Sequence, residues 1–547
     1  MAPTPSDTSP LLLVNGKIFQ SPNTKDTQPS FHSCMLVRDG LIRHVGSESD
    51  AEIVQARDGA VQTRDLGGKT VLPGFIDGHL HILTMGQTLQ KAHLDKCKSL
   101  ADIRAAIKAH AEAHPSDPRV MASGWMSFMT PDGVHHSMLD DLDPRPIYVD
   151  SKDLHSGWLN AAAIAEMGLE AMQDPEGGTI FRDADGKATG EMAEAAVFSL
   201  LWPHLATIAS LDERVAAVRG AVDAYHAAGY TGMIDMAMDD TIWDAVLELR
   251  RRGPVPMRIS AYWLIKPAKT EAEHLAQVAR AAELNRLYNS TTSPDCRVVG
   301  IKVVCDGIVD ACTASLTEPY AHNALAVDPL WSPAQLAPVV AAADAAGLQV
   351  ALHAIGDRTV ATVLDAIEAH CSAARRPRVE HLELTTPEDA ARLGRLGVTA
   401  SVQPVHADPA TFGGWPRLLG SARCARAFAY SEFAEGGATL ALGTDAPTAP
   451  NHPLQNLYVA TTRRSAREPG AHDAVNANFA LDLCQAAAAA TRGAAYSCFL
   501  DGVAGSLEAG KKADFVVVDM RWEPEELLGA RILETWFEGA RVYEAPA

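Results

Sequence analysis

The alternation of strand and helix patterns in the middle of the chain restricts its fold most strongly. Apolar runs rich in β-branched residues, typical of buried strands, recur at residues 229–238, 297–307, 347–357, 377–384, 397–404 and 438–447. Alanine-rich amphipathic segments typical of helices lie between them, so that successive strands are spaced by about 20 to 50 residues. This alternation predicts a parallel α/β sheet. Because no glycine-rich dinucleotide fingerprint follows the early strands, a closed (β/α)8 barrel is favoured over an open sheet.

Both ends of the chain carry short strand patterns instead. Residues 11–19 and 34–46 contain an Asn-Gly and an Asp-Gly step between apolar runs, and these dipeptides are strong hairpin signals. Strand-like runs return at residues 505–519 and 532–544. Because both ends are rich in strands and a long mixed region separates them, we predict that they pair into one small β-sandwich.

These patterns divide the chain into three parts. We predict that residues 1–71 and 500–547 form the β-sandwich and that residues 72–499 form the barrel. Within the barrel region, residues 91–211 follow no regular pattern and are rich in Trp, His and Asp. We predict that this segment is a long insertion after the first barrel strand.

Composition excludes several classes of partner. Of the 547 residues, 47% are hydrophobic and 21% are charged, which is an ordinary globular balance with enough apolar residues for a large core. The net charge of −21 repels phosphate, so we expect neither nucleic acid nor an anionic membrane as a partner. No apolar run reaches the length of about 18 residues that a membrane span needs. A homodimer is compatible with this size, although no sequence feature establishes one.

Cysteine usage and the N-terminus indicate the compartment. The nine cysteines are scattered, form no Cys-x-x-Cys pair and are odd in number, which is typical of free thiols in a reducing compartment. The first residues lack a basic leader before their short apolar run, unlike a signal peptide. We therefore expect a cytoplasmic protein.

The stretch "VLPGFIDGHLHI" at residues 71–82 places two histidines one residue apart after an apolar run. Side chains at positions i and i+2 of a strand point the same way, so His79 and His81 are expected to project together. Neutral imidazole is a common ligand of zinc and other divalent metals, and such a pair suits a metal ion. On this stretch alone, one structural and one solvated histidine would be equally consistent.

Four more polar residues lie within or at the ends of the later predicted strands: Lys302, His353, His381 and Asp445. Each alone has a simpler explanation, such as a hydrogen-bonded histidine, a snorkelling lysine or a helix-capping aspartate. In a barrel, however, functional groups gather at the carboxyl ends of the strands. Separate structural roles for all of them would leave several buried polar groups without partners, at a high cost. We therefore predict that they share one site with His79 and His81.

The ordered set resembles the amidohydrolase superfamily, which carries His-x-His on the first barrel strand, Lys on the fourth, His on the fifth and sixth, and Asp on the eighth. The sequence around these residues is similar to that of the YtcJ-like branch, amidohydrolase family 3, which includes N-substituted formamide deformylases. The phrases that carry this resemblance include "LPGFIDGHLHI", "DLHSGWLNAAAI", "GIKVVCDG", "ALHAIGDRTVATVLDAIE", "VEHLELTTPEDAARLGRLGVTASVQP" and "LGTDAP". It runs from about Leu11 to Asp519.

The resemblance implies two nearby divalent metal ions. His79 and His81 would bind the first ion together with Asp445, and His353 and His381 would bind the second. Lys302 would bridge them as a carboxylated lysine, since an ammonium has no lone pair whereas a carbamate offers two oxygens. Zinc suits this ligand set, iron or manganese could also occupy it, and a site with one ion remains an alternative.

The activity implied by the resemblance is hydrolysis of a C–N bond in a small amide, N-acyl or N-formyl compound by a metal-activated water. Asp445 would accept the proton of that water and pass it to the leaving nitrogen. Residues His155, Trp158 and Asn160 of the phrase "DLHSGWLN" are candidates for binding this small-molecule substrate; an insertion loop that only packs on the barrel is the alternative.

Two other functions remain open at this level. The same metal barrel could host a decarboxylase or another lyase, because one fold supports many chemistries. A non-catalytic assembly protein on a degenerate barrel would be expected to have lost metal ligands, yet all six are present. After the Asp306–Gly307 step, residues 308–312 depart from the small loop usual in such relatives, so their common substrates need not apply.

Overall fold

A computed structural model describes residues 10–20, 27–59, 61–94, 96–152, 156–175, 178–194 and 196–546. The chain forms two compact units. Unit 1 comprises Met1–Ile82, Val222–Trp243 and Arg250–Ala547, and unit 2 comprises Leu83–Ala221 and Asp244–Leu249.

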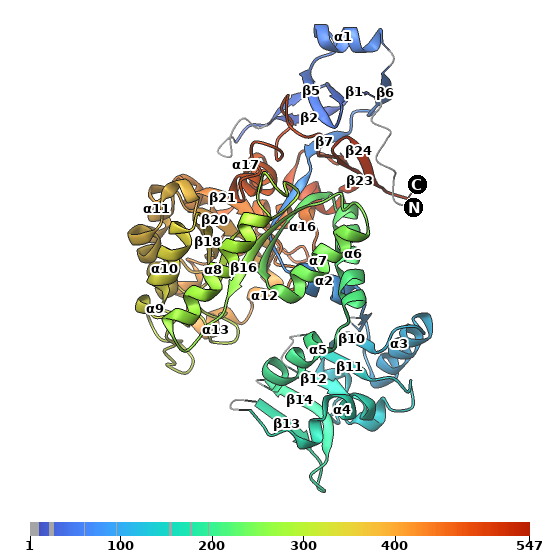
Figure 1. Ribbon diagram of the computed structural model, residues 1–547, viewed down its shortest axis with the longest axis vertical. Coiled ribbons are helices and arrows are strands. Elements are labelled where there is room, and N and C mark those ends of the chain that lie inside the picture. The colour runs from blue at the N-terminus through green and yellow to red at the C-terminus, as the bar shows by residue number, and fades with distance from the viewer. Residues whose placement is uncertain are drawn as a thin grey trace. The chain divides into compact units, whose positions relative to one another are not determined.

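Unit 1 contains an eight-stranded parallel sheet that curls into a barrel (Figure 1). In spatial order its strands are β8 (Phe75–Leu80), β15 (Tyr230–Met238), β16 (Arg258–Ile265), β17 (Cys296–Val304), β18 (Gln349–Ala354), β19 (Arg378–His381), β20 (Thr399–Val402) and β21 (Thr439–Leu442). The predicted (β/α)8 barrel is therefore confirmed. The sequence patterns missed β16, because Arg, Ser, Tyr and Trp in "RISAYWLI" interrupt its apolar, β-branched run.

The barrel closes where β8 meets the end of β21. Leu80 forms a parallel bridge with Ala446, and the backbone N–H of Asp445 donates to the carbonyl of His79 at 2.7 Å. The strands approach so closely that a Cβ on Gly78 would lie 2.7 Å from the Leu442 carbonyl oxygen, which only glycine avoids. Closure thus brings the first and last strand ends side by side.

Helices connect the strands and cover the outside of the barrel (Figure 1). They include α8 (Glu271–Leu287), α9 (Pro333–Ala345), α10 (Asp357–His370), α11 (Pro387–Arg395), α15 (Tyr430–Glu435), α16 (Pro453–Thr462) and α17 (Leu483–Ala488). In α10 the residues Val360, Val363, Leu364 and Ile367 are buried, which is the spacing of one apolar helical face. Thr386 begins α11 by accepting the backbone N–H of Asp389.

Two small sheets form the sandwich, and the larger one combines strands from both ends of the chain. One has the order β24-β23-β22-β7-β2-β3 and the other β5-β4-β1-β6. Their bounds are β1 (Leu11–Val14), β2 (Lys17–Gln20), β3 (Ser30–His32), β4 (Cys34–Arg38), β5 (Leu41–Gly46), β6 (Gln62–Asp65), β7 (Thr70–Pro73), β22 (Phe515–Asp519), β23 (Arg531–Phe537) and β24 (Ala540–Glu544). Phe515 pairs with Pro73, and side chains of both sheets share one core. The predicted β-sandwich from both chain ends is confirmed.

The two glycine turns in this sandwich behave differently. Asp39 and Gly40, both at positive φ, form the predicted hairpin between β4 and β5. The Asn15-Gly16 step makes no hairpin, because β1 pairs with β4 and β6 whereas β2 pairs with β3 and β7. Asn15, at φ 54°, instead carries the chain from one sheet to the other. A local turn signal does not specify the partner strand, and here partners distant in sequence are preferred.

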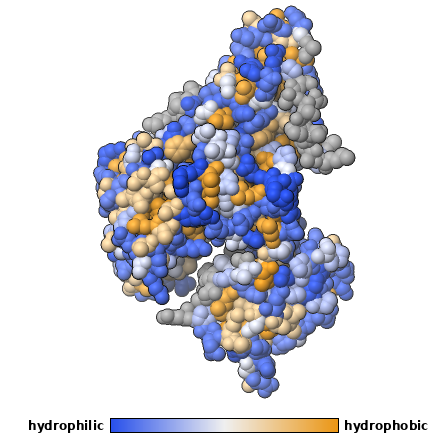
Figure 2. Space-filling view, viewed as in Figure 1, coloured by the Kyte–Doolittle hydropathy of each residue, from blue (hydrophilic) through white to orange (hydrophobic). Residues whose placement is uncertain are grey.

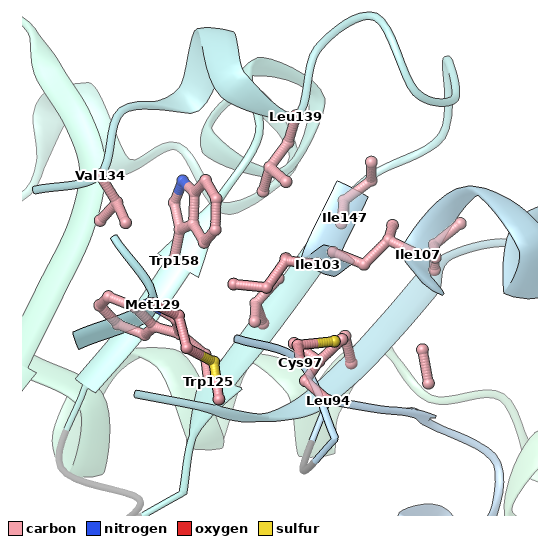
Figure 3. Close-up of a cluster of buried hydrophobic side chains, with 14 of the residues drawn as sticks. Leu94, Cys97, Ile103, Ile107, Trp125, Met129, Val134, Leu139, Ile147 and Trp158 are labelled. Atoms are coloured by element: carbon pink, nitrogen blue, oxygen red, sulfur yellow. The ribbon is translucent and has the colours of Figure 1, made fainter. Parts of the chain in front are cut away.

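Unit 2 follows β8 and forms the long insertion predicted after the first barrel strand. Its sheet has the order β13-β14-β12-β11-β10-β9. The bounds are β9 (Ala92–His93), β10 (Val120–Trp125), β11 (Ile147–Ser151), β12 (Ser156–Leu159), β13 (Gly178–Arg182) and β14 (Ala188–Glu194), with helices α3 (Leu100–Ala113), α4 (Ala161–Met167) and α5 (Trp202–Ile208). Figure 3 shows a core in which Trp158 packs with Leu139 and Val134. The insertion therefore has a hydrophobic core of its own.

Polar and apolar residues are interspersed on the face shown in Figure 2. None of the described helices combines the length and the apolar composition that a membrane span needs.

Candidate metal centre

The six residues singled out in the barrel sequence all lie on or just after barrel strands in unit 1: His79, His81, Lys302, His353, His381 and Asp445. The Nε2 atoms of His79 and His81 lie 3.5 and 3.1 Å from Asp445 Oδ1. The ring of His381 lies 4.8 Å from that of His79 and 4.3 Å from that of His353, measured between centroids. The structure thus brings four histidines and one carboxylate into one group.

Lys302 projects from β17, which pairs directly with the strand that carries His353. Its side chain is almost completely buried, and no ion pair to it forms within the described parts of the chain. Burial lowers the pKa of its amine, although the charges of Glu380 and Asp445 act in the opposite direction. A charged lysine buried without an ion pair is costly, so burial favours the neutral amine at this position.

A buried ion pair fixes the orientation of His79. Its Nδ1 lies 2.8 Å from Glu380 Oε2, and Arg378 Nε donates to Glu380 Oε1 at 2.8 Å. Burial opposes ionisation of Glu380, but Arg378 and His79 hold its pKa well below the ordinary value. A carboxylate at Nδ1 keeps the proton on that nitrogen and leaves the lone pair of Nε2 directed toward Asp445.

The pKa shifts of His79, His353 and His381 favour the neutral imidazole, which is the form that binds metals. Burial lowers the pKa of His353 to about 3 and that of His79 to about 4, with Lys302 adding to both shifts. It lowers the pKa of His381 well below the ordinary value. At His81 burial acts in the same direction, but the neighbouring carboxylate of Asp445 outweighs it and raises the pKa. Neutral imidazoles around one carboxylate are a donor set that suits a divalent cation.

Several polar atoms of this group are buried without a hydrogen-bond partner. They are His353 Nε2, His381 Nδ1 and Asp445 Oδ1. His353 Nε2 lies 3.5 Å from Asp306 Oδ1, yet without hydrogen-bond geometry. Buried polar atoms are nearly always satisfied in folded proteins, so three such atoms in one place indicate a missing partner. A divalent metal ion fits their chemistry, and the ligand atoms of His79, His81 and Asp445 lie within 4.8 Å of one another.

Backbone strain also occurs at these strand ends. His381, Leu382 and Asp445 have φ values of 79°, 53° and 56°, in the left-handed region that residues with a Cβ seldom adopt. Such strain persists where surrounding contacts fix the chain, and it is common at functional sites. Here it sets the direction in which His381 and Asp445 leave their strands.

Several residues that build this centre were not predicted from the sequence. The pairing of Arg378 with Glu380 could have been found, because residues i and i+2 of a strand share a face. His406 was also missed, although it follows β20 by four residues in "QPVHAD". Its Nε2 lies 3.7 Å from Asp445 Oδ2, and it forms a second three-residue donor group with His381 and Asp445. Applying the strand-end criterion to the seventh strand would have identified it.

The predicted substrate residues belong to unit 2. His155 lies outside the described residues. Trp158 is fully buried and donates from Nε1 to the His135 carbonyl at 3.2 Å. Asn160 begins α4, and its side-chain oxygen accepts the backbone N–H groups of Ile147 and Ala163. Both side chains have roles inside unit 2, and their assignment to substrate binding stays a prediction.

Comparison with known proteins gives consistent results. The protein-family model described as "Amidohydrolase family" matches residues 62–543 of this chain. Protein LONG AFTER FAR-RED 3 of Arabidopsis thaliana is 30% identical, over 97% of this chain and 91% of its own length. The protein named "Putative amidohydrolase YtcJ" of Bacillus subtilis is 28% identical, over 93% of this chain and 96% of its own length. The N-substituted formamide deformylase of Arthrobacter pascens is 24% identical over 98% of both.

Among solved structures, that of an uncharacterized metal-dependent hydrolase from Pyrococcus furiosus has a TM-score of 0.78 to this chain at 23% identity. It covers 94% of this chain and 99% of its own. At this level of identity the likeness supports the fold.

Proposed function

The chain belongs to the amidohydrolase family, and on this premise we propose that it hydrolyses a C–N bond in a small amide, N-acyl or N-formyl compound with the help of bound divalent metal. The observation that carries the proposal is the group of buried, unpartnered donor atoms at the strand ends. The N-formyl class is included because one relative is named as an N-substituted formamide deformylase.

Six side chains would hold the metal: His79, His81, Lys302, His353, His381 and Asp445. When bound, a divalent ion such as zinc supplies Lewis acidity, which polarises a carbonyl group and lowers the pKa of water. Two ions are proposed because the donor atoms form two groups that share Asp445, one with His79 and His81 and the other with His381 and His406.

Asp445 is the carboxylate that we assign to proton transfer. Both oxygens of Asp77, Asp306 and Glu380 are engaged by donors of the barrel. Asp445 Oδ1 accepts no well-formed hydrogen bond and lies 3.1 Å from His81 Nε2. Burial opposes its ionisation, but the surrounding histidines hold its pKa well below the ordinary value, so Asp445 is ionised, which is the form that can accept a proton. Asp445 takes this proton from the attacking water and delivers it to the leaving nitrogen, which is a poor leaving group unless protonated.

Carboxylation of Lys302 would resolve its unpaired burial. The lone pair of the neutral amine forms a bond to the carbon of carbon dioxide, one proton leaves the nitrogen, and a carbamate with two oxygens results. Burial favours the neutral amine that this step requires. The product replaces a buried amine by an anion that can contact metal on both oxygens.

The test is hydrolysis by the full-length protein loaded with Zn²⁺, Mn²⁺ or Co²⁺, using N-formyl, N-acetyl and cyclic amides with aromatic and aliphatic amines. Release of amine and acid in equal amounts, lost after chelation and regained on adding metal, is expected. Asp445→Asn serves as the control for contaminating hydrolases. Protein that binds metal but releases no amine from any of these substrates would refute the proposal. Carbon dioxide as the product would identify a lyase instead.

A further inference from the structure

Gln403 is a buried polar side chain at the end of barrel strand β20 that carries no assigned role. It directly follows the strand, and its exposed fraction is 1%. Neither its amide oxygen Oε1 nor its amide nitrogen Nε2 has a hydrogen-bond partner within the parts of the chain that the structure describes. A buried amide without partners is costly, and buried polar atoms are nearly always satisfied in folded proteins. The free amide of Gln403 therefore indicates a partner from outside the folded chain.

The backbone directs this side chain into the barrel. Two residues earlier, the Ser401 hydroxyl accepts a hydrogen bond from Arg378 Nη2 at 3.0 Å. Arg378, on β19, also donates to the Gly78 carbonyl of β8 at 2.7 Å, and because these strands are not neighbours in the sheet, the contact runs through the barrel interior. Gln403 has an extended backbone, with φ −118° and ψ 90°, and side chains at positions i and i+2 of an extended segment share a face. Its side chain therefore lies on the interior face, one step nearer the carboxyl ends of the strands, where the proposed metal ligands lie.

Hydrogen bonds to the surrounding backbone hold Gln403 in this place. Its carbonyl accepts the hydroxyl of Tyr430 at 3.3 Å. Asn456 ties the following turn to the last barrel strand, because its Oδ1 accepts the Val405 N–H at 3.1 Å and its Nδ2 donates to the Gly443 carbonyl at 2.9 Å. Gln403 is thus fixed beside the strand end that leads to the carboxylate assigned to proton transfer.

Gln349, on β18, shows how a structural glutamine is satisfied in the same barrel. It is also 1% exposed, yet its Oε1 accepts the Tyr262 hydroxyl and its Nε2 donates to the carbonyl of Ser497 at 3.0 Å. Because the two glutamines are buried to the same extent, burial alone does not explain why the amide of Gln403 is free.

We propose that Gln403 is a specificity-determining residue, whose Oε1 accepts the N–H of a secondary amide substrate. This inference rests on the proposed function and narrows it to amides that carry a hydrogen on the scissile nitrogen. In that function the carbonyl oxygen of the substrate has metal as its partner, which leaves the N–H as the polar group that still needs one. A side-chain amide with both atoms free can turn Oε1 toward this donor. The nitrogen keeps its hydrogen, and its lone pair stays available for the second proton, which Asp445 delivers as the C–N bond breaks.

Two pairs of amides and two variants test this assignment. N-butylformamide and N-butylacetamide carry the N–H, and their N-methyl counterparts replace it by a methyl group. Q403M retains nearly the volume of glutamine, but the sulfur of methionine is only a weak acceptor. Q349M is the matched control, because it removes a buried amide whose two atoms are engaged.

The first measurement is kcat/KM for amine release by the zinc-loaded, full-length proteins, with zinc equivalents per chain. We expect the wild-type protein to prefer the N–H amides by about 10- to 100-fold, because a methylated nitrogen leaves a buried acceptor unpaired. Q403M should lose most of this preference at unchanged zinc content. Equal rates for both amides of a pair in the wild-type protein, or a preference that survives in Q403M, would overturn the proposal. Zinc loss in Q403M would overturn it in favour of a ligand role.

Thermal stability separates this role from a structural one. Removing an amide that has no partner should not lower the melting temperature of Q403M. Q349M should melt at a lower temperature, because the Tyr262 hydroxyl and the Ser497 carbonyl each lose a partner. A decrease for Q403M as large as that for Q349M would show that Gln403 serves the fold, and the proposal would be wrong.

Binding distinguishes a failure of this inference from a failure of the proposed function. The four amides are added to the zinc-loaded proteins, and the rise in melting temperature reports binding. If the N–H amides stabilise the wild-type protein more than their N-methyl counterparts do, and Q403M loses this difference, Gln403 binds the amide N–H even when no amine is released. That result without amine release would refute the proposed function alone. Equal binding within each pair, or binding of none of the four, would overturn the assignment of Gln403.

Discussion

Replacing Glu380 by glutamine is expected to weaken both the fold and metal binding, because one carboxylate serves both. Glu380 is fully buried, accepts a hydrogen bond from Arg378 Nε at 2.8 Å and lies 2.8 Å from His79 Nδ1. Arg378 is also fully buried. The neutral amide has nearly the shape of the carboxylate but leaves this guanidinium without its counter-charge.

The expected magnitudes follow from this geometry. Removing one partner of a buried ion pair costs about 3–5 kcal/mol, and we expect a loss of unfolding free energy in this range. The amide nitrogen can donate to His79 Nδ1, which moves the ring proton to Nε2, the atom 3.5 Å from Asp445. Because a protonated Nε2 cannot bind metal, zinc affinity should fall about 10- to 100-fold, or by about 1.4 to 2.7 kcal/mol.

Urea-induced unfolding of the metal-free protein and zinc competition with a chelator measure the two effects separately. The control is Glu368→Gln on α10, since Glu368 also pairs with an arginine, Arg392 Nη2 at 2.7 Å, but is half-exposed. An exposed ion pair contributes no more than about 1 kcal/mol, and zinc affinity should not change. If Glu380→Gln were as stable as this control and bound zinc equally well, the assignment of Glu380 to both roles would be wrong.

Three further predictions concern other parts of the same centre. Asp445→Asn should retain the fold by circular dichroism but lower kcat by about 10²- to 10⁴-fold, and an unchanged rate would identify another proton acceptor. Lys302→Ala should lose activity that added acetate or propionate partly restores, whereas full activity without them would exclude a bridging carbamate. Burial raises the pKa of Asp306 to about 6, above its unfolded value of 3.8, so its stabilising effect is complete below pH 3.8 and lost as pH rises through 6. Relative to Asp306→Asn, the unfolding free energy of the wild-type protein should therefore fall by about 3 kcal/mol between pH 3 and pH 8, and a difference independent of pH would contradict this shift.

The parts of the fold that the sequence predicts are those with strong periodicity. Buried parallel strands need continuous apolar runs, and the helices between them need one apolar face, so the barrel could be derived from pattern alone. Strand β16 was not predicted because the buried residues Tyr262 and Trp263 stand where β-branched residues would be expected. The hairpin prediction at Asn15-Gly16 was wrong because a turn dipeptide specifies the local backbone conformation and not which strands pair with each other.

The residues of the site also differ in how well the sequence predicts them. Histidine, lysine and aspartate at strand ends are visible in the sequence because they interrupt apolar runs. The partners that orient them are harder to find, since Glu380 acts on His79, which lies 301 residues away in the chain. The role of Trp158 could not be predicted from the sequence either. A tryptophan in an insertion has the same local sequence whether it faces a substrate or fills the core of that insertion.

Closing the barrel and assembling the centre depend on the same contacts. The carboxylate of Asp77 accepts the Thr444 backbone N–H at 2.9 Å and its hydroxyl at 2.5 Å, which fixes the residue directly before Asp445. Arg378 donates at 2.7 Å to the carbonyl of Gly78, the residue directly before His79. The last strand end is therefore held against the first by groups that also set the directions of Asp445 and His79. Substitutions at these contacts should therefore change stability and metal affinity together.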